Sequence, residues 1–325
     1  MRLDSVRELK QSLFTSVLST ANLDQLARVA GTHARRLPAA NVRLIALGIA
    51  RRAPEDYLLA VRVQSPLLLR SRQVERIVAR ARNEAEVRYV GRIHKLATPW
   101  QQKRTRPLKI GVSIGHYKIT AGTLGCFVSA GEVMVLSNNH VLANENSARK
   151  GDDILQPGAY DGGKQPGDVV AKLDRFVRLQ TTGANVVDCA AATLAEGIDY
   201  NAATITGVGK LAGAGDLHAS DAVSKMGRTT GATQGKITAF EVDNLVIGYD
   251  MGELRFDGQV EVESAGEGPF SQGGDSGSLI VNGATEAIAL LFAGSDTGGS
   301  NGLGLTYANP FDEVLKQLKV DLVTK

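Results

Sequence analysis

The spacing of apolar residues in the first hundred positions predicts helices followed by a small β-β-α-β unit. Two apolar runs, Val42–Ala50 and Tyr57–Val63, flank a turn containing Pro54 and predict a strand pair. Helical spacing returns over 66–82, and the run Glu86–Ile93 predicts a third strand. Before these runs, helical spacing extends to about Arg36 through the following apolar residues: Val6, Leu9, Leu13, Val17, Leu18, Leu23, Leu26 and Val29.

A different pattern begins after the basic, proline-bounded segment Pro99–Pro107, which we interpret as a linker. Short apolar runs alternate with glycine turns, which favours barrels or a sandwich over βαβ units. Helical spacing at the end predicts a closing helix over 311–322. We therefore expect an α+β module at 1–104 and a mainly β domain at 105–325.

The charge distribution supports two modules. Residues 1–106 hold 21 Lys and Arg against 8 Asp and Glu, whereas residues 107–325 hold 16 against 26. The arginines of residues 28–106 could bind nucleic acid, but Tyr57, Tyr89 and Trp100 are the only aromatic residues in that range, so base stacking is poorly provided. A solvated surface, or one that docks on the acidic domain or on an acidic partner, fits the composition better.

The start of the chain, MRLDSVRELKQ, is charged and lacks the apolar segment of a signal peptide. The chain contains two cysteines, Cys126 and Cys189, whereas a secreted β protein of this kind usually carries several disulfides. No window approaches 18 uninterrupted apolar residues, so no membrane span is expected. We expect a cytoplasmic protein with two thiols.

The segment SQGGDSGSLIV, Ser271–Val281, places Ser276 among glycines at the start of an apolar strand. A serine nucleophile needs a base within reach and donors aimed at the developing oxyanion. Glycine lets the backbone curl so that its N–H groups can supply those donors. The loop is therefore a candidate oxyanion site, with the N–H groups of Gly274 and Ser276 as donors.

His140 is the best candidate for the base, because it follows the apolar run VMVLS and so lies on a defined framework. Asp188 is the best candidate to orient it, because an Asp flanked by valines is costly to bury without a partner. Asp275 lies too near the serine for that role and is expected to brace the loop. The remaining histidines and the rival acids lie in more polar or less defined surroundings: His33, His94, His116, His218, Asp168, Asp174 and Asp199.

The blocks LSNNHVLA, VVDCAAATL and GGDSGSLIV resemble, in order and spacing, the catalytic blocks of chymotrypsin-fold (trypsin-like) serine peptidases, and most resemble the prokaryotic intracellular ones. The resemblance covers about residues 107–322. It implies two six-stranded antiparallel β-barrels, at about 107–205 and 206–310, with a C-terminal helix. His140, Asp188 and Ser276 would form the triad in the cleft between the barrels. An α/β-hydrolase is excluded because its triad runs Ser, Asp, His.

The resemblance also implies a specificity pocket at Phe270, Phe292, Ala293 and Gly304. Phe270 stands where trypsin-type enzymes carry an Asp that binds Lys or Arg, which argues against basic specificity, although Asp296 could still supply a charge. The segment Lys109–Gly115 has a faint likeness to an activation cleavage site, but it lies nearer to His140 than is usual.

The expected function is therefore that of a serine endopeptidase that acts through an acyl-enzyme and is regulated by its N-terminal module, in a prokaryotic regulatory or anti-phage pathway. The alternatives are a catalytically silent peptidase fold used as a binding module, and a nucleic-acid-binding protein. No cofactor is expected. The glycines of Gly207–Gly215 lack the Lys-Ser/Thr pair of a phosphate loop. Calcium at Asp152, Asp153 and Asp161 is less well supported than surface loops, and no Cys/His set has zinc spacing.

Overall fold

A computed structural model describes residues 1–18, 44–91, 98–217 and 222–325. The chain divides into two compact units, Met1–Ala97 and Thr98–Lys325. The division falls earlier than the boundary expected at residue 104. The expected linker is part of the second unit: Gln102 Nε2 donates to the Arg228 carbonyl at 3.1 Å, and Thr105 N donates to Gln156 Oε1 at 3.0 Å. The basic composition and the flanking prolines indicated a linker and gave no sign of these contacts.

The N-terminal unit packs two helices on a three-stranded sheet in the order β1-β2-β3. Strands β1 and β2 are antiparallel, and β3 runs parallel to β2, so the predicted helix and β-β-α-β module is confirmed. The predicted continuation of the first helix at Leu23, Leu26 and Val29 lies outside the described residues. The elements are α1 (Leu3–Leu13), η1 (Phe14–Leu18), β1 (Ile45–Ala53), β2 (Asp56–Val63), η2 (Pro66–Leu68), α4 (Arg72–Arg80) and β3 (Ala85–Tyr89).

Helix α4 illustrates how the sequence specifies this unit. The Ser71 side chain caps the helix by accepting a hydrogen bond from Val74 N at 3.3 Å. Val74 and Ile77 are buried, whereas Arg72 and Arg76 are exposed. Val74 and Ile77 pack with Leu59 and other strand residues in an apolar cluster confined to this unit, so the unit has its own core.

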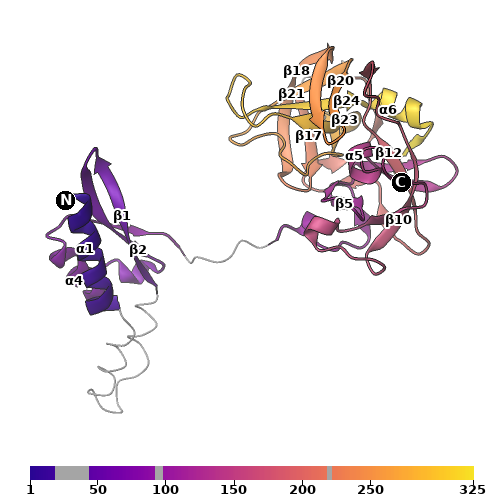
Figure 1. Cartoon of the computed structure of the whole chain (residues 1–325). Helices are drawn as coiled ribbons and strands as arrows, with labels where there is room; N and C mark the ends of the chain where they lie inside the picture. The colour runs from indigo at the N-terminus through magenta and orange to yellow at the C-terminus, as the bar shows by residue number, and fades with distance from the viewer. Residues whose placement is uncertain (19–43, 92–97, 218–221) are drawn as a thin grey trace. The chain divides into compact units, whose positions relative to one another are not determined.

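The second unit contains a closed β-barrel. Its six strands follow the order β23-β22-β17-β18-β21-β24, and an additional pairing of β24 with β23 closes the ring. A short strand, β16 (Gly213–Ala214), runs parallel to β23 outside the ring. The barrel strands are β17 (Ala222–Gly227), β18 (Gly231–Val242), β21 (Gln259–Ser264), β22 (Leu279–Asn282), β23 (Glu286–Gly294) and β24 (Leu305–Pro310). Figure 1 shows most of these strands in orange and yellow.

The preceding strands form a curled sheet that does not close, so the expectation of two complete six-stranded barrels holds for one of them. The sheet order is β25-β7-β8-β12-β10-β9-β5-β6. Its terminal strand β6 has two residues, and Thr123 N in that strand donates to the Ser276 carbonyl at 2.8 Å instead of extending the sheet. The strands are β5 (Ser113–His116), β6 (Gly122–Thr123), β7 (Cys126–Ser129), β8 (Val133–Ser137), β9 (Asp153–Leu155), β10 (Val169–Phe176), β12 (Ala190–Leu194) and β25 (Asp321–Val323).

The predicted C-terminal helix is present as α6 (Phe311–Leu318) and ends earlier than expected. Lys319 adopts φ 56°, a left-handed conformation that ends the helix, and β25 then pairs with β7. The smaller elements of the unit are η3 (Trp100–Gln102), β4 (Leu108–Lys109), α5 (Asn139–Leu142), η4 (Ala159–Asp161), β11 (Ala184–Asn185), β13 (Tyr200–Asn201), β14 (Thr204–Ile205), β15 (Gly209–Lys210), β19 (Leu245–Tyr249) and β20 (Gly252–Phe256).

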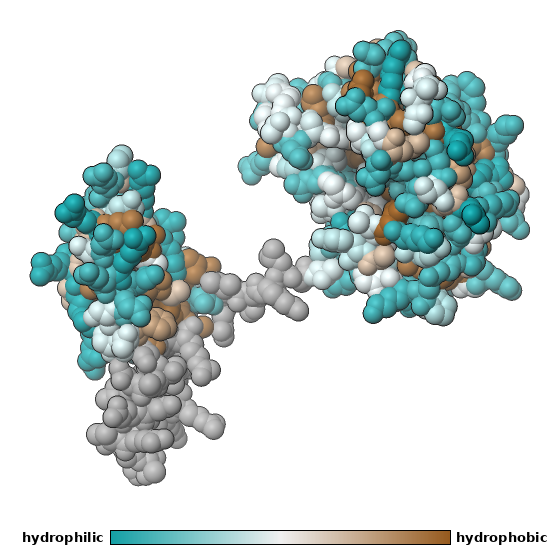
Figure 2. Space-filling view, in the orientation of Figure 1, coloured by the Kyte–Doolittle hydropathy of each residue, from teal (hydrophilic) through white to brown (hydrophobic). Residues whose placement is uncertain are grey.

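Hydrophilic residues cover most of the visible face of each unit, with apolar residues interspersed among them (Figure 2). None of the helices in the described ranges has both the length and the apolar character needed to span a membrane.

Candidate active site

His140 lies at the end of β8, in the short helix α5 that follows it. Its imidazole Nδ1 lies 2.6 Å from Asp188 Oδ2, and its backbone N–H donates to Asp188 Oδ1 at 3.3 Å. The imidazole is 23% exposed, whereas the Asp188 side chain is fully buried. The contact to the acceptor-only carboxylate requires the proton on Nδ1, which leaves Nε2 as the basic nitrogen of the neutral ring.

Asp188 lies between β11 and β12, and both of its backbone polar groups are held by buried amides. Its N–H donates to Asn309 Oδ1 at 2.9 Å, and its carbonyl accepts from Asn138 Nδ2 at 2.7 Å. Asp168 and Asp174 instead form ion pairs with basic side chains elsewhere. Of the acids proposed to orient His140, the structure thus brings Asp188 to it.

Charge and burial set the protonation of this pair. Burial favours the neutral imidazole, but the negative charge of Asp188 and its hydrogen bond outweigh burial and raise the pKa of His140. Burial would raise the pKa of Asp188, but the charge of His140 and hydrogen bonds from His140 and Tyr249 hold it below its usual value. Asp188 is therefore a carboxylate that can stabilise a protonated imidazole.

Ser276 is half-buried and lines the same cavity as His140, Gly274 and Asp250. The cavity has a volume of about 420 Å³. No hydrogen bond joins the His140 and Ser276 side chains, both of which are in the described part of the chain. The absence of this hydrogen bond does not exclude a base, because catalytic hydrogen bonds are often poorly aligned until substrate binds. His140 and Ser276 therefore face one space.

Two glycines give the loop around Ser276 its shape. Gly274 and Gly277 adopt φ of +94° and +91°, which a residue with a side chain rarely does. A Cβ on Gly277 would lie 2.0 Å from Ser137 Oγ and 2.4 Å from the Thr123 carbonyl oxygen. Among the described residues, the N–H groups of Gly274 and Ser276 donate no hydrogen bond, so both remain available to a ligand.

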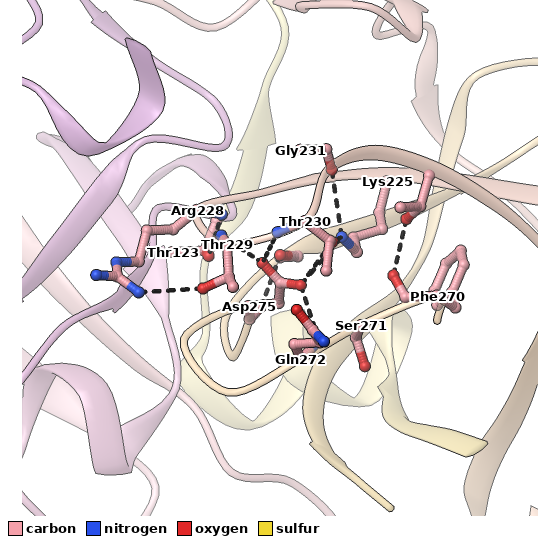
Figure 3. A network of polar contacts seen from close by, with 12 residues as sticks. Thr123, Lys225, Arg228, Thr229, Thr230, Gly231, Phe270, Ser271, Gln272 and Asp275 are labelled. Atoms are coloured by element: carbon pink, nitrogen blue, oxygen red, sulfur yellow. Dashed lines mark hydrogen bonds and ion pairs between the residues drawn. The ribbon is translucent and has the colours of Figure 1, made fainter. Parts of the chain in front are cut away.

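The carboxylate of Asp275 lies at the centre of a network of polar contacts that anchors the loop (Figure 3). Its Oδ1 accepts from the N–H groups of Thr229 and Thr230 at 2.7 and 3.2 Å. Its Oδ2 accepts from Thr230 Oγ1 and Gln272 N at 2.7 and 3.0 Å. The ammonium of Lys225 lies 3.3 Å from the same oxygen, and both side chains are fully buried. Asp275 is therefore bound by charge and by backbone contacts.

Sequence reasoning missed Lys225, which lies in the apolar strand β17. Its ammonium also donates to Thr230 Oγ1 and to the Gly231 carbonyl, and it lies 5.7 Å from the centre of the Phe270 ring. A lysine within the segment AVSKMG was the available signal, because a buried ammonium requires an anionic partner. The sequence could not indicate which acid that partner is. Burial lowers the pKa of Lys225, although Asp275 opposes the effect.

The structure does not gather the residues expected at the specificity pocket into one cluster. Phe270 is 2% exposed and packs with barrel residues such as Val262, whereas Phe292 and Ala293 pack with Phe256 in another cluster. Gly304 adopts φ +86° against the Ser295 carbonyl. The expectation came from the resemblance, and the pocket stays a prediction.

The other titratable candidates have partners away from Ser276. His116 Nε2 lies 3.1 Å from Asp152 Oδ2, Asp153 pairs with Lys172, and Asp161 pairs with Arg228. Within the described ranges, no group of three or more His, Cys, Asp or Glu could hold a metal ion. His33, His94 and His218 lie outside the described residues. Asp152, Asp153 and Asp161 are therefore each engaged with another side chain.

We predict that Lys225→Met destabilises the second unit by about 3–5 kcal/mol, because it leaves the Asp275 carboxylate buried without its cation. The free energy of unfolding in urea measures this change. Lys210→Met is the matched control, because Lys210 is exposed and forms no ion pair with the described residues. The double variant Lys225→Met/Asp275→Asn should recover part of the loss. Equal stability of Lys225→Met and Lys210→Met would contradict the assignment.

The comparisons with known proteins bear on the fold. No family model and no curated protein matches this chain. Among solved structures, the chain is similar to a chymotrypsin from Cellulomonas bogoriensis, at 20% identity over 67% of this chain and 99% of that one, with a TM-score of 0.45. Protease A of Thermobifida fusca is 16% identical over 67% of this chain and 99% of that one, with a TM-score of 0.47. A glutamic acid-specific serine protease is 19% identical over 66% of this chain and 100% of that one, with a TM-score of 0.48. The structure is thus similar to chymotrypsin-fold serine proteases at low identity, and this likeness concerns the fold alone.

Proposed function

We propose that the chain is a serine endopeptidase in which Ser276 is the nucleophile, His140 the general base and Asp188 the residue that orients the base. The observation that carries this proposal is the buried Asp188 carboxylate on His140 Nδ1, which leaves Nε2 as the basic nitrogen of a ring that lines the same cavity as Ser276. The motif order His, Asp, Ser supports the same assignment.

In the proposed reaction, Ser276 Oγ attacks the carbonyl carbon of a peptide bond while its proton passes to His140 Nε2. The N–H groups of Gly274 and Ser276 stabilise the negative charge on the carbonyl oxygen. His140 then gives its proton to the leaving amine, and an acyl-enzyme on Ser276 remains. Water hydrolyses the ester by the same route in reverse. Asp188 stays ionised throughout and stabilises the imidazolium.

The loop that supplies these donors is stabilised by groups from within its own unit. The Asp275 carboxylate has a cation, Lys225, and N–H donors from the turn after β17 and from Gln272. Activation by cleavage near Lys109–Gly115 is therefore not needed to provide a cation for Asp275. We propose that the second unit folds directly into the active arrangement.

A fluorophosphonate probe should label the wild-type protein and should fail to label Ser276→Ala, because the probe phosphorus reacts with an activated serine oxygen. Ser278→Ala is the matched control, because Ser278 follows in the same loop, is buried and donates its hydroxyl to the Asp275 carbonyl at 2.6 Å. Absence of labelling in the wild type would favour a binding module. Labelling that persists in Ser276→Ala would remove Ser276 from its role.

The rate of labelling should fall at acid pH as His140 becomes protonated, since only the neutral imidazole accepts the serine proton. Because Asp188 raises the pKa of His140, the acid limb should lie above the ordinary histidine value of 6.5. Asp188→Asn should slow labelling by about 10³–10⁴-fold and move that limb to lower pH. A flat profile between about pH 5 and pH 8 would show that His140 is not the base.

We further propose that the N-terminal unit regulates this activity by docking its basic surface on the acidic second unit. Arg70, Arg72, Arg76 and Arg82 are exposed and form no ion pair with described residues, which leaves their charge available. Leu67, 87% exposed beside Arg70, adds an apolar contact. Residues 98–325 hold 19 Lys and Arg against 26 Asp and Glu, and the resulting net charge of −7 is complementary to this surface.

Peptidase activity of the full chain and of residues 98–325 tests this regulation. We expect the two activities to differ by several-fold at low salt and to converge at about 1 M salt, where ion pairs between exposed groups are screened. Arg72→Glu/Arg76→Glu should reproduce the deletion, whereas the same changes at Arg7 and Arg88, which already have acidic partners, should have less effect. Equal activities at every salt concentration would show that the N-terminal unit does not regulate the site.

A further inference from the structure

The carboxylate that orients His140 has a second side-chain donor, Tyr249, which lies in the three-stranded sheet of order β11-β20-β19. Tyr249 Oη donates to Asp188 Oδ2 at 2.7 Å, the same oxygen that lies 2.6 Å from His140 Nδ1. The Tyr249 ring also meets the His140 ring edge-on, with centroids 6.0 Å apart and planes at 76°. Tyr249 therefore contacts both members of the pair.

Tyr249 ends β19. The hairpin β19–β20 that carries it packs on Phe292 of β23 and pairs with β11, the strand that precedes Asp188. The ring of Tyr249 stacks on Phe256 of β20, with centroids 5.9 Å apart, and Phe256 packs on Phe292 at 4.7 Å. Strand β20 pairs in parallel with β11, which ends shortly before Asp188. Asn185 Nδ2 of β11 also donates to the Arg255 carbonyl at 3.1 Å. The hairpin and the Asp188 segment are therefore one packed assembly.

The turn of the hairpin is bound by the loop that follows His140. The Glu145 carboxylate accepts hydrogen bonds from the N–H groups of Asp250 and Met251 at 3.2 and 3.1 Å. Asn144, Glu145 and Asn146 all adopt left-handed backbone conformations, with φ of 47°, 49° and 69° in chain order. Three consecutive left-handed residues other than glycine are costly, so the surrounding structure must enforce this conformation.

The phenol of Tyr249 is suited to donate and not to ionise. Burial raises the pKa of Tyr249 well above its usual range, and the charge of Asp188 raises it further. The hydroxyl therefore keeps its proton at every pH at which a peptidase would work. Its proton is directed at a carboxylate, which accepts only.

We propose that the hairpin β19–β20 is a positioning device for the His140–Asp188 pair, with Tyr249 as second donor to the orienting oxygen and Glu145 as its clasp. The inference rests on the proposed peptidase function of the same site. Two donors on Oδ2 restrict rotation of the carboxylate, so His140 Nδ1 meets an oxygen in a defined place. Tyr249 also takes up part of the negative charge, which limits how basic His140 becomes.

Tyr249→Phe tests the proposal, because it removes the hydroxyl and keeps the ring that stacks on Phe256. We expect kcat for a peptide substrate to fall about tenfold with KM changed less than twofold, since the donor acts on the pair and not on substrate binding. The acid limb of kcat/KM should move to higher pH, because Asp188 is left with more unshared charge facing His140. Tyr307→Phe is the control, because Tyr307 Oη donates to Glu261, at another place.

Changes at Glu145 should distinguish the effect of its negative charge on His140 from the effect of its hydrogen bonds to the hairpin. Glu145→Gln keeps one of the two acceptor oxygens that bind the hairpin and removes a negative charge that raises the pKa of His140, so the acid limb should move to lower pH, opposite to Tyr249→Phe. Glu145→Ala should lower kcat as Tyr249→Phe does. Asp250 and Lys118 also line the cavity beside His140, and both stay unchanged in these variants.

An NMR titration of the His140 ring keeps the inference independent of activity. In Tyr249→Phe the pKa of His140 should rise relative to wild type and to Tyr307→Phe, whether or not the protein cleaves peptides. If Tyr249→Phe shows this rise but the wild type is not labelled by the fluorophosphonate, the peptidase proposal fails and the positioning contact stands. If Tyr249→Phe matches Tyr307→Phe in kcat, pH profile and His140 pKa, the hairpin is only structural and the inference is overturned.

Discussion

A buried carboxylate, that of Asp275, is the constraint on which the candidate site depends. Burying an ionised group without partners is prohibitively costly, so the chain must bring donors and a cation to it. Lys225 in β17, the turn Thr229–Thr230 and Gln272 N all converge on its two oxygens. A Cβ on Gly227 would lie 2.3 Å from Asp275 Oδ1, so the residue at the end of β17 must be one without a side chain. Together these contacts place Ser276, the next residue, at the cavity.

The two sheet systems of the second unit are joined at the same place. Thr123 of the curled sheet donates through its backbone to the Ser276 carbonyl and through its hydroxyl to the Gly274 carbonyl at 2.9 Å. Asn309 of the closed barrel accepts from Asp188 N, and Tyr249 reaches Asp188 Oδ2. Each half of the unit therefore positions residues of the other, and an error in the packing of the two sheets would separate His140 from Ser276. The open end of the curled sheet at β6 is part of this arrangement.

The sequence predicted what depends on local patterns. Apolar spacing located α4, β1 and β2 of the N-terminal unit, and the glycine-rich segment around Ser276 indicated a loop of unusual backbone, which Gly274 and Gly277 confirm. The buried position of Asp188 followed from its valine neighbours. The contacts of Lys225 with Asp275 and of Tyr249 with Asp188 could not be predicted, because these partners lie 50 and 61 residues away along the chain. Likewise, nothing in the sequence of Pro99–Pro107 indicated that Gln102 and Thr105 form hydrogen bonds with residues far along the second unit. Barrel closure was also overestimated, since it depends on the pairing of distant strands.

The central claim is that Ser276 forms an acyl-enzyme with the help of His140. Rapid mixing with an activated ester that releases a coloured phenol, followed by acid quenching and peptide mass spectrometry, tests it most directly. The account predicts a burst of phenol equal to one equivalent of protein. It also predicts an acyl group on the peptide that contains Ser276 and loss of both signals at acid pH. A linear release without a burst, or an acyl group on a residue other than Ser276, would contradict it.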